Sequence, residues 1–330
     1  MVRLQPYNYE RFVQADHLEF SFGGGEANVA VSLANYGLDA VYVTKLPAHA
    51  IGQAAVNSLR RYGVDTSMIV RGGDRIGIYY NEEGASQLGS VCIYDRAHSA
   101  IQESTPSDFD WDVIFKGADW FLFTGITPAL GPNMVNACRD ACKAAKAHGV
   151  RISCDLNYRG KLWSRQAREA MTDLCQYVDV CISNEEDAKD VFGIEAEATD
   201  IYAGEINREG YKSVARQLAD RFGFEKVAIT LRESRSASDN GWSAMLFDAV
   251  GNEYHFSKKY DLHIIDRVGG GDSFGGGLIY ALLAGKGNQR AVEFAVAASA
   301  LKHTVEGDYN MVTAAEVEKL ADGDGSGRIQ

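Results

Sequence analysis

Three consecutive glycines followed by an aspartate are the residues best suited to chemistry in this chain. In the segment IIDRVGGGDSFGGGLIYALLAG, an extended run ends at Asp266, Gly269, Gly270 and Gly271 follow, and an apolar helix is expected to begin near Asp272. Glycines allow a tight turn, and the N–H groups at a helix N-terminus attract anions. A carboxylate in that first turn would repel a bound phosphate, so we expect Asp272 to act on a neighbouring proton as a general base.

The same turn also has a purely structural interpretation. Glycines cap helices, and an aspartate often only stabilises the first turn. Two familiar phosphate-binding patterns are excluded, because no lysine follows the glycines as in GxxxxGK[ST] and the dinucleotide GxGxxG context is absent.

The segments that must position this turn alternate between strand and helix. From about residue 118 to 285, apolar runs such as ADWFLFTGI, VRISCDLN and KVAITL alternate with amphipathic stretches such as PNMVNACRDACKAAKAHG and YKSVARQLADRFG. This alternation is typical of βαβ units. We therefore expect a mainly parallel sheet covered by helices on both faces, with ligands at the carboxyl ends of its strands.

Residues 68–97 have a different pattern. Short strand-like runs broken by Gly and Asn follow one another without a convincing helix. We expect a small antiparallel insertion that could close over a ligand and, being marginal alone, would prefer a partner surface.

Composition narrows the classes of function. The chain has 330 residues, 46% of them hydrophobic, and can bury a large core. Its formal charge of −12 argues against sequence-independent binding to nucleic acid and against binding to an anionic membrane. With no signal-peptide pattern and no apolar run of about eighteen residues, we expect a cytoplasmic protein. Six cysteines without CxxC or zinc-ligand spacing predict buried free thiols.

Two motifs resemble the signatures of one family. DRVGGGDSF resembles the D-T-x-G-A-G-D signature of the ribokinase (PfkB) carbohydrate kinases, with Arg267 in place of Thr and Gly270 in place of Ala. GGGEANVAVSLANYGL resembles the family's G-G-x-x-x-N-x-A, matched through Asn28 and Ala30. The resemblance spans roughly residues 20 to 320 in consistent order.

This resemblance implies a fold and a mechanism. The fold would be a ribokinase-like three-layer α/β fold, with residues 1–330 as one kinase domain and a small antiparallel β lid formed by about 68–97 and part of the N-terminal segment. The backbone of Gly269, Gly270 and Gly271 would form an anion hole, and Asp272 would activate the acceptor hydroxyl. ATP and Mg²⁺ are the implied cofactors, and the resemblance leaves open a monovalent cation such as K⁺.

Further implied residues would contact the nucleotide and metal. SNEEDA resembles the family's N-x-x-E motif, with Asn184 matching for the phosphates and Asp187 at the metal position where Glu is usual; Glu185 or Glu186 could compensate. A helix N-cap would explain the same residues. After KVAITL, relatives carry T-x-G-x-x-G, whereas this chain has TLRES and a longer loop reaching Gly241, which leaves Thr230 and Arg232 as phosphate neighbours.

Within the family, the chain most resembles kinases of 2-keto-3-deoxygluconate. This similarity is carried by GIYY, IYDRAHSA, GITPAL and DLNYRGKLW. Arg96 and Arg159 suit a sugar-acid carboxylate, which arginine binds bidentately. As a solvated surface charge, each arginine would have no such role. The full set of implied substrate residues is Gly24, Asn28, Tyr79, Tyr94, Arg96 and Arg159.

Other functions and states stay open at this point. Family members begin with an apolar strand leading into G-E-x-M-x-R-L, whereas MVRLQP matches only the end of that segment, so we expect the first core strand to be absent. That would favour a kinase-like protein that binds the sugar acid without phosphorylating it. A kinase for a neutral sugar such as fructose or ribose is a third candidate. The expected partners are small molecules, with a homo-oligomer formed through the lid.

Overall fold

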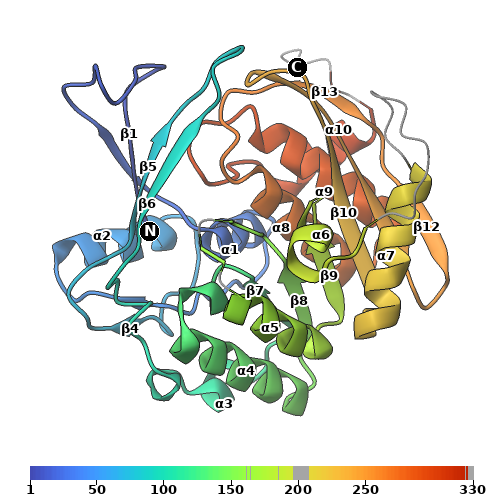
Figure 1. The fold of residues 1–330 in the computed structure, drawn as a ribbon, viewed down its shortest axis with the longest axis horizontal. Coiled ribbons are helices and arrows are strands. Elements are labelled where there is room, and N and C mark those ends of the chain that lie inside the picture. The colour runs from blue at the N-terminus through green and yellow to red at the C-terminus, as the bar shows by residue number, and fades with distance from the viewer. Residues whose placement is uncertain (161, 164, 185, 196–207, 324, 326–330) are drawn as a thin grey trace. The chain divides into compact units, whose positions relative to one another are not determined.

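The chain forms two compact units in the computed structural model, which describes all residues except 161, 164, 185, 196–207, 324 and 326–330 (Figure 1). The first, here called the turn unit, comprises Met1–Ile101, Ser234–Ser243 and Ser257–Gln330. The second, the sheet unit, comprises Gln102–Glu233 and Ala244–Phe256.

The largest sheet is mostly parallel. Its strands β7, β8, β9 and β12 lie in the sheet unit, whereas β13 belongs to the turn unit. The strand order of this sheet is β12-β11-β10-β9-β8-β7, and β13 pairs with β11. Strands β7 to β10 run parallel, whereas β12 and β13 are antiparallel to β11. The strands are β7 (Trp120–Thr124), β8 (Arg151–Asp155), β9 (Val180–Ser183), β10 (Lys226–Ser234), β11 (Asp239–Asp248), β12 (Glu253–Phe256) and β13 (Tyr260–His263).

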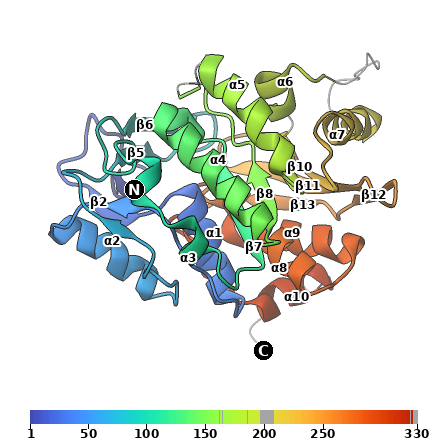
Figure 2. The ribbon, with the colours of Figure 1, turned by 90° about the horizontal axis from the view of Figure 1, so that it is seen from below.

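Helices connect the parallel strands, as the alternating sequence pattern predicts. Figure 2 shows α4 and α5 lying over β7 and β8. The connecting helices are α3 (Trp111–Ile114), α4 (Pro132–Ala147), α5 (Arg165–Leu174), α6 (Asp187–Phe192) and α7 (Arg208–Phe222), with 3₁₀ turns at Pro106–Asp108, Pro128–Leu130 and Cys175–Tyr177. Within the described ranges, no helix combines the length and apolar character that a bilayer crossing requires.

The core of the sheet unit explains the cysteines. Cys138, Cys142, Cys154, Cys175 and Cys181 are buried free thiols, while Cys92 in the turn unit is free and half-buried. Burial raises the pKa of Cys142 to about 12. These thiols act as small apolar core residues, and the prediction of buried free cysteines is confirmed for five of the six.

A smaller sheet of order β2-β1-β5-β6 belongs to the turn unit and is called the lid sheet below. β1 pairs antiparallel with β2 and parallel with β5, and β5 pairs antiparallel with β6. Part of the 68–97 segment lies outside it, because β4 pairs with β3 instead. The strands are β1 (Val2–Gln5), β2 (Glu19–Phe22), β3 (Lys45–Leu46), β4 (Val70–Arg71), β5 (Ile78–Glu82) and β6 (Val91–Asp95).

Close helix packing holds the glycine turn in the same unit. A Cβ atom on Gly276 of α8 would lie 2.9 Å from Cβ of Ser32 in α1, and one on Gly277 would lie 3.0 Å from Cα of Ala295 in α9. Small residues therefore let α8 lie against both neighbours. The helices are α1 (Gly25–Asn35), α2 (Ala50–Arg60), α8 (Gly270–Leu283), α9 (Asn288–Lys302) and α10 (Ala314–Ala321).

The expected mixed α/β ribokinase-like fold, with a large mostly parallel sheet and a smaller, mainly antiparallel one, is confirmed. One pairing of the smaller sheet, β1 with β5, is parallel. The expected long loop after KVAITL is wrong. β10 continues through Ser234, β11 begins at Asp239, and Arg235 and Ser236 donate backbone hydrogen bonds to the Asp239 carbonyl. Extended backbone accepts any side chain, so Glu233 can stand here without a glycine.

β7 is the last strand of the large sheet. It pairs with β8 on one side, and among the described residues no strand pairs with it on the other side.

Candidate active site

The glycine turn adopts a conformation that requires glycine. Gly269 precedes α8 with a φ of 81°, in the left-handed region. A Cβ atom there would lie 2.1 Å from the carbonyl oxygen of Asp308. At Gly271, by contrast, no atom beyond the adjacent residues and the backbone of its own helix lies within 4 Å of the place that a Cβ would take. The first turn of α8 therefore has an open backbone surface, which suits an anion such as a phosphoryl group.

Asp272 stands in that first turn and is oriented by Asn28 of α1. The Asn28 amide nitrogen donates to Oδ2 of Asp272 at 2.7 Å and to Oδ2 of Asp308 at 3.3 Å. The Asn28 side-chain oxygen accepts the backbone N–H of Gly24 at 3.2 Å. Because Asn28 is buried, its amide fixes the Asp272 carboxylate beside the open helix terminus. A general base needs this kind of restraint.

A buried cluster of charges lies next to Asn28. Arg3 of β1 donates to Oδ1 of Asp308 at 2.9 Å and to Oδ2 of Asp266 at 2.7 Å, and it is fully buried. Tyr79 donates its hydroxyl hydrogen to Asp308. Burial lowers the pKa of Arg3, but the two carboxylates outweigh burial and raise it overall. The guanidinium therefore stays charged and links the lid sheet to the glycine turn.

The lid residues predicted to bind substrate share one face of the lid sheet. Tyr79 of β5 lies opposite Tyr94 of β6, with ring centroids 6.5 Å apart. The Arg96 guanidinium lies 4.2 Å from the Tyr94 ring centroid, which is a cation–π distance. Arg96 is half-buried. Ring contacts and hydrogen bonds thus form one continuous series of neighbouring side chains. In order, it contains Arg96, Tyr94, Tyr79, Asp308, Asn28 and Asp272, and the Gly24 N–H is hydrogen-bonded to Asn28.

In the sheet unit, Asn184 and Asp187 form a reciprocal cap at the start of α6. Oδ1 of Asn184 accepts the backbone N–H of Asp187 at 2.9 Å, and Oδ2 of Asp187 accepts the backbone N–H of Asn184 at 3.2 Å. Oδ1 of Asp187 accepts the N–H of Tyr158 at 3.0 Å. Burial raises the pKa of Asp187, and these backbone hydrogen bonds and the charge of Arg159 oppose the rise. Glu185 lies outside the described residues, and Glu186 is exposed.

The other sheet-unit residues predicted for the site differ in exposure. Arg159 is exposed, with Nη1 3.4 Å from the carbonyl oxygen of Tyr158. Thr230 and Arg232 lie two residues apart on β10, the first buried and the second exposed. Their roles stay predictions.

Comparison with known proteins identifies the family. The family model described as pfkB family carbohydrate kinase matches residues 1–315. The chain belongs to this family.

The most similar relatives of this PfkB kinase include two named sugar-acid kinases. The crystal structure of 2-dehydro-3-deoxygluconokinase from Thermotoga maritima superimposes with a TM-score of 0.93 at 50% identity, covering 98% of this chain and 97% of that one. A 2-dehydro-3-deoxygalactonokinase from Haloferax volcanii is 33% identical over 99% of this chain and 96% of its own length. A PfkB family carbohydrate kinase from Listeria grayi has a TM-score of 0.89 at 33% identity, with 98% and 97% coverage.

The acidic side chains bear on how Mg²⁺ could be held when it is bound with ATP. Among the described residues, no group of three or more His, Cys, Asp or Glu side chains could hold a metal ion. Mg²⁺ in nucleotide sites is commonly held by one or two carboxylates, by water and by the substrate phosphates. Asp187, a buried carboxylate beside Asn184, fits this mode of binding.

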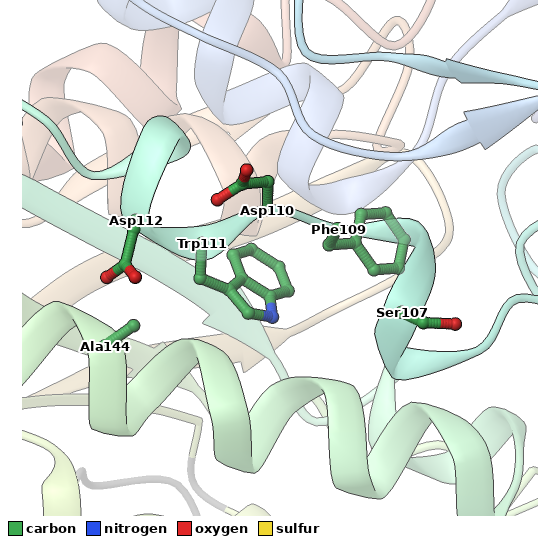
Figure 3. A pocket seen from close by; sticks show the side chains of 6 residues that line it. All are labelled: Ser107, Phe109, Asp110, Trp111, Asp112 and Ala144. Atoms are coloured by element: carbon green, nitrogen blue, oxygen red, sulfur yellow. The ribbon is translucent and has the colours of Figure 1, made fainter.

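A cavity of about 490 Å³ in the sheet unit contains none of the predicted site residues (Figure 3). Asp110 caps α3 by accepting the Val113 N–H at 3.2 Å, and Asp112 pairs with His148 at 3.0 Å. Both acidic side chains that line the cavity therefore already have partners in the protein. The lining residues are Ser107, Phe109, Asp110, Trp111, Asp112 and Ala144.

Proposed function

We propose that this kinase transfers the γ-phosphoryl group of ATP to the terminal hydroxyl of 2-keto-3-deoxygluconate, giving the 6-phosphate. The observation that carries the proposal is Asp272, oriented by Asn28 at the open N-terminus of α8. The names of the Thermotoga and Haloferax relatives support a 2-keto-3-deoxy sugar acid as the substrate class. Because those names differ in the sugar, the assay below includes both epimers.

In the proposed mechanism, Asp272 accepts the proton of the terminal hydroxyl. The hydroxyl oxygen then forms the new bond to the γ-phosphorus while the bond to the bridging β,γ oxygen breaks, releasing ADP. Backbone N–H groups of Gly269, Gly270 and Gly271 stabilise the charge on the transferring group. Mg²⁺, when bound with ATP, neutralises phosphate charge, and Asp187 would contribute to holding it. Asn184, Thr230 and Arg232 would contact the phosphates.

Arg96 would bind the substrate carboxylate, and the sequence predicts the same role for Arg159. Arg96 stacks on Tyr94 and is half-buried, so its pairing with a carboxylate would be partly shielded from water. A neutral sugar would leave this guanidinium without a bidentate partner, which disfavours fructose or ribose. A non-catalytic binding protein is disfavoured by the joint presence of the base and the open anion site. We place the reaction in the cytoplasm, where ATP is supplied.

A coupled ADP-release assay across sugar acids and neutral sugars tests the proposal. We expect 2-keto-3-deoxygluconate or its galactonate epimer to give the highest kcat/KM, at least tenfold above fructose and ribose, because only the acids engage the arginines. The tenfold margin corresponds to about 1.4 kcal/mol of differential binding. A higher kcat/KM on a neutral sugar would refute the substrate class. ATP-independent binding without ADP release would favour the binding protein.

Self-association through the lid sheet is a second part of the proposal. Leu4 lies opposite Phe20 and Tyr80, and Tyr80 lies opposite Ile93, so one apolar row crosses all four strands. Phe20 and Ile93 are 49% and 51% exposed. Such a row on a thin sheet suits a second copy of the same surface.

The double variant Phe20→Asp/Ile93→Asp is expected to sediment as a monomer, because charges on this row disfavour its burial. Sedimentation velocity measures the effect. Val13→Asp, at a loop position that is 90% exposed, should sediment like the wild type. A monomeric wild type, or an unchanged double variant, would rule out this interface.

A further inference from the structure

A fully buried lysine lies directly behind the glycine turn. Lys302, the last residue of α9, donates from Nζ to the carbonyl oxygens of Val305 at 2.9 Å and of Asp266 at 3.4 Å. Its Cε lies 3.3 Å from the place that a Cβ on Gly269 would take. The end of the lysine side chain therefore packs against Gly269, and its ammonium group binds the carbonyl oxygens of Asp266 and Val305.

Three carboxylates act on Lys302 and favour its charged form. The carboxylates of Asp266, Asp308 and Asp272 all act on it, and Arg3 supplies the other nearby cation. Burial lowers the pKa of Lys302, while the three carboxylates oppose that shift. Without this ammonium, three carboxylates would face one guanidinium even before a phosphate arrives. Uncompensated buried charge of this kind is strongly unfavourable.

A monovalent cation such as K⁺ does not fit behind this turn. A cation that supports an anion hole has to lie where carbonyl oxygens point away from the anion. Those of Asp266 and Val305 already accept hydrogen bonds from Lys302. The carbonyl of Gly270 accepts the Ser299 hydroxyl at 2.7 Å, and that of His303 accepts the Ile265 N–H at 2.8 Å. Protein donors thus occupy the oxygens that such an ion would need.

We propose that Lys302 is a built-in cation of the anion hole, which replaces a bound monovalent cation. Its ammonium holds the carbonyls that flank the turn, keeps Gly269 in place and offsets the charge of the transferring phosphoryl group. Lys302 is a positioning residue, since it acts through the turn and touches no reacting atom. The inference rests on the proposed kinase function and adds that the enzyme requires no K⁺.

Two measurements test this role. Wild-type kcat should be equal in potassium, sodium and tetramethylammonium chloride at one ionic strength. Lys302→Met keeps an unbranched side chain as far as Cε and removes the charged Nζ. It should lower kcat about ten- to a hundredfold with a smaller change in the sugar KM, which is somewhat less than the loss from removing a direct hydrogen-bond donor to the oxyanion. Ammonium or methylammonium ions should restore part of that loss. Lys319→Met, in the last turn of α10 and exposed, is the matched control and should keep wild-type kcat.

Thermal melting gives a readout that does not depend on kinase activity. Ammonium ions should raise the Tm of Lys302→Met and leave that of the wild type unchanged, because only the variant has room for the ion. Activation of the wild type by K⁺ over tetramethylammonium, or wild-type kcat in folded Lys302→Met, would overturn the inference. A wild type inactive on every sugar would instead refute the proposed function, and the melting comparison would then decide the role of Lys302. If the variant does not fold, the wild-type salt comparison decides.

Discussion

Asp272→Asn is expected to lower kcat about a hundred- to ten-thousandfold, the usual contribution of a general base. The amide oxygen of the new residue can still accept the hydrogen bond from Asn28, so the fold and substrate binding should persist. What is lost is the negative charge that receives the hydroxyl proton. Steady-state kinetics, with circular dichroism to confirm folding, measure the effect.

Glu316→Gln is the matched control for Asp272. Both acids are the third residue of a helix, but Glu316 of α10 accepts the backbone N–H and hydroxyl of Thr313 in a capping box. The pKa of Glu316 is lowered by those bonds, so its stabilising effect exists above the unfolded-state pKa and is lost as the pH falls through the folded pKa. Gln can still complete the capping box, so this variant should lose only the interaction of the charge with the helix N-terminus, about 0.3 to 1 kcal/mol, and no turnover. Equal kcat losses in both variants would mean that Asp272 only stabilises a helix.

Arg96→Ala should raise the KM for the sugar acid while kcat falls much less. The substrate carboxylate carries the same charge in the ground and transition states, so its binding is uniform. Removing one partner of a partly desolvated ion pair costs about 2 to 5 kcal/mol, so kcat/KM should fall more than about thirtyfold.

The control for Arg96 is another lid arginine. Arg75 pairs with Asp95 at 2.7 Å, with both side chains more than 30% exposed, and Arg75→Ala should change kcat/KM little. The Arg96 variant should also lose little on a carboxylate-free analogue. An equal loss of kcat/KM on the acid and on the analogue would show that Arg96 supports the lid and does not bind the carboxylate.

Residues within local motifs could be predicted from the sequence. The glycine turn, Asp272 and Asn28 stand in short patterns whose chemistry follows from residue type, and the structure brings Asn28 and Asp272 within hydrogen-bonding distance. Alternation of apolar and amphipathic segments likewise predicted the strands and helices of the sheet unit. Here the decisive interactions are local or periodic.

Residues whose roles arise from distant contacts could not be found in this way. Arg3 meets Asp266 and Asp308 only after the chain has folded, across most of its length. A single arginine between apolar residues in VRL carries no signal of such partners. Lys302 has the sequence pattern of an ordinary lysine at a helix C-terminus, and only its burial beneath Gly269 distinguishes it. At TLRES the absence of a glycine predicts a longer loop, whereas the strand β10 continues to Ser234 because its pairing does not depend on a glycine.

The position of the new phosphate ester tests the central claim most directly. The wild type is incubated with ATP, Mg²⁺ and 2-keto-3-deoxygluconate, and the product is analysed by phosphorus-31 NMR with proton coupling. We expect one new ester, coupled to the two protons of the terminal carbon, and none from Asp272→Asn over the same time. An ester at another carbon, no ester at all, or an equal yield from the variant would contradict it.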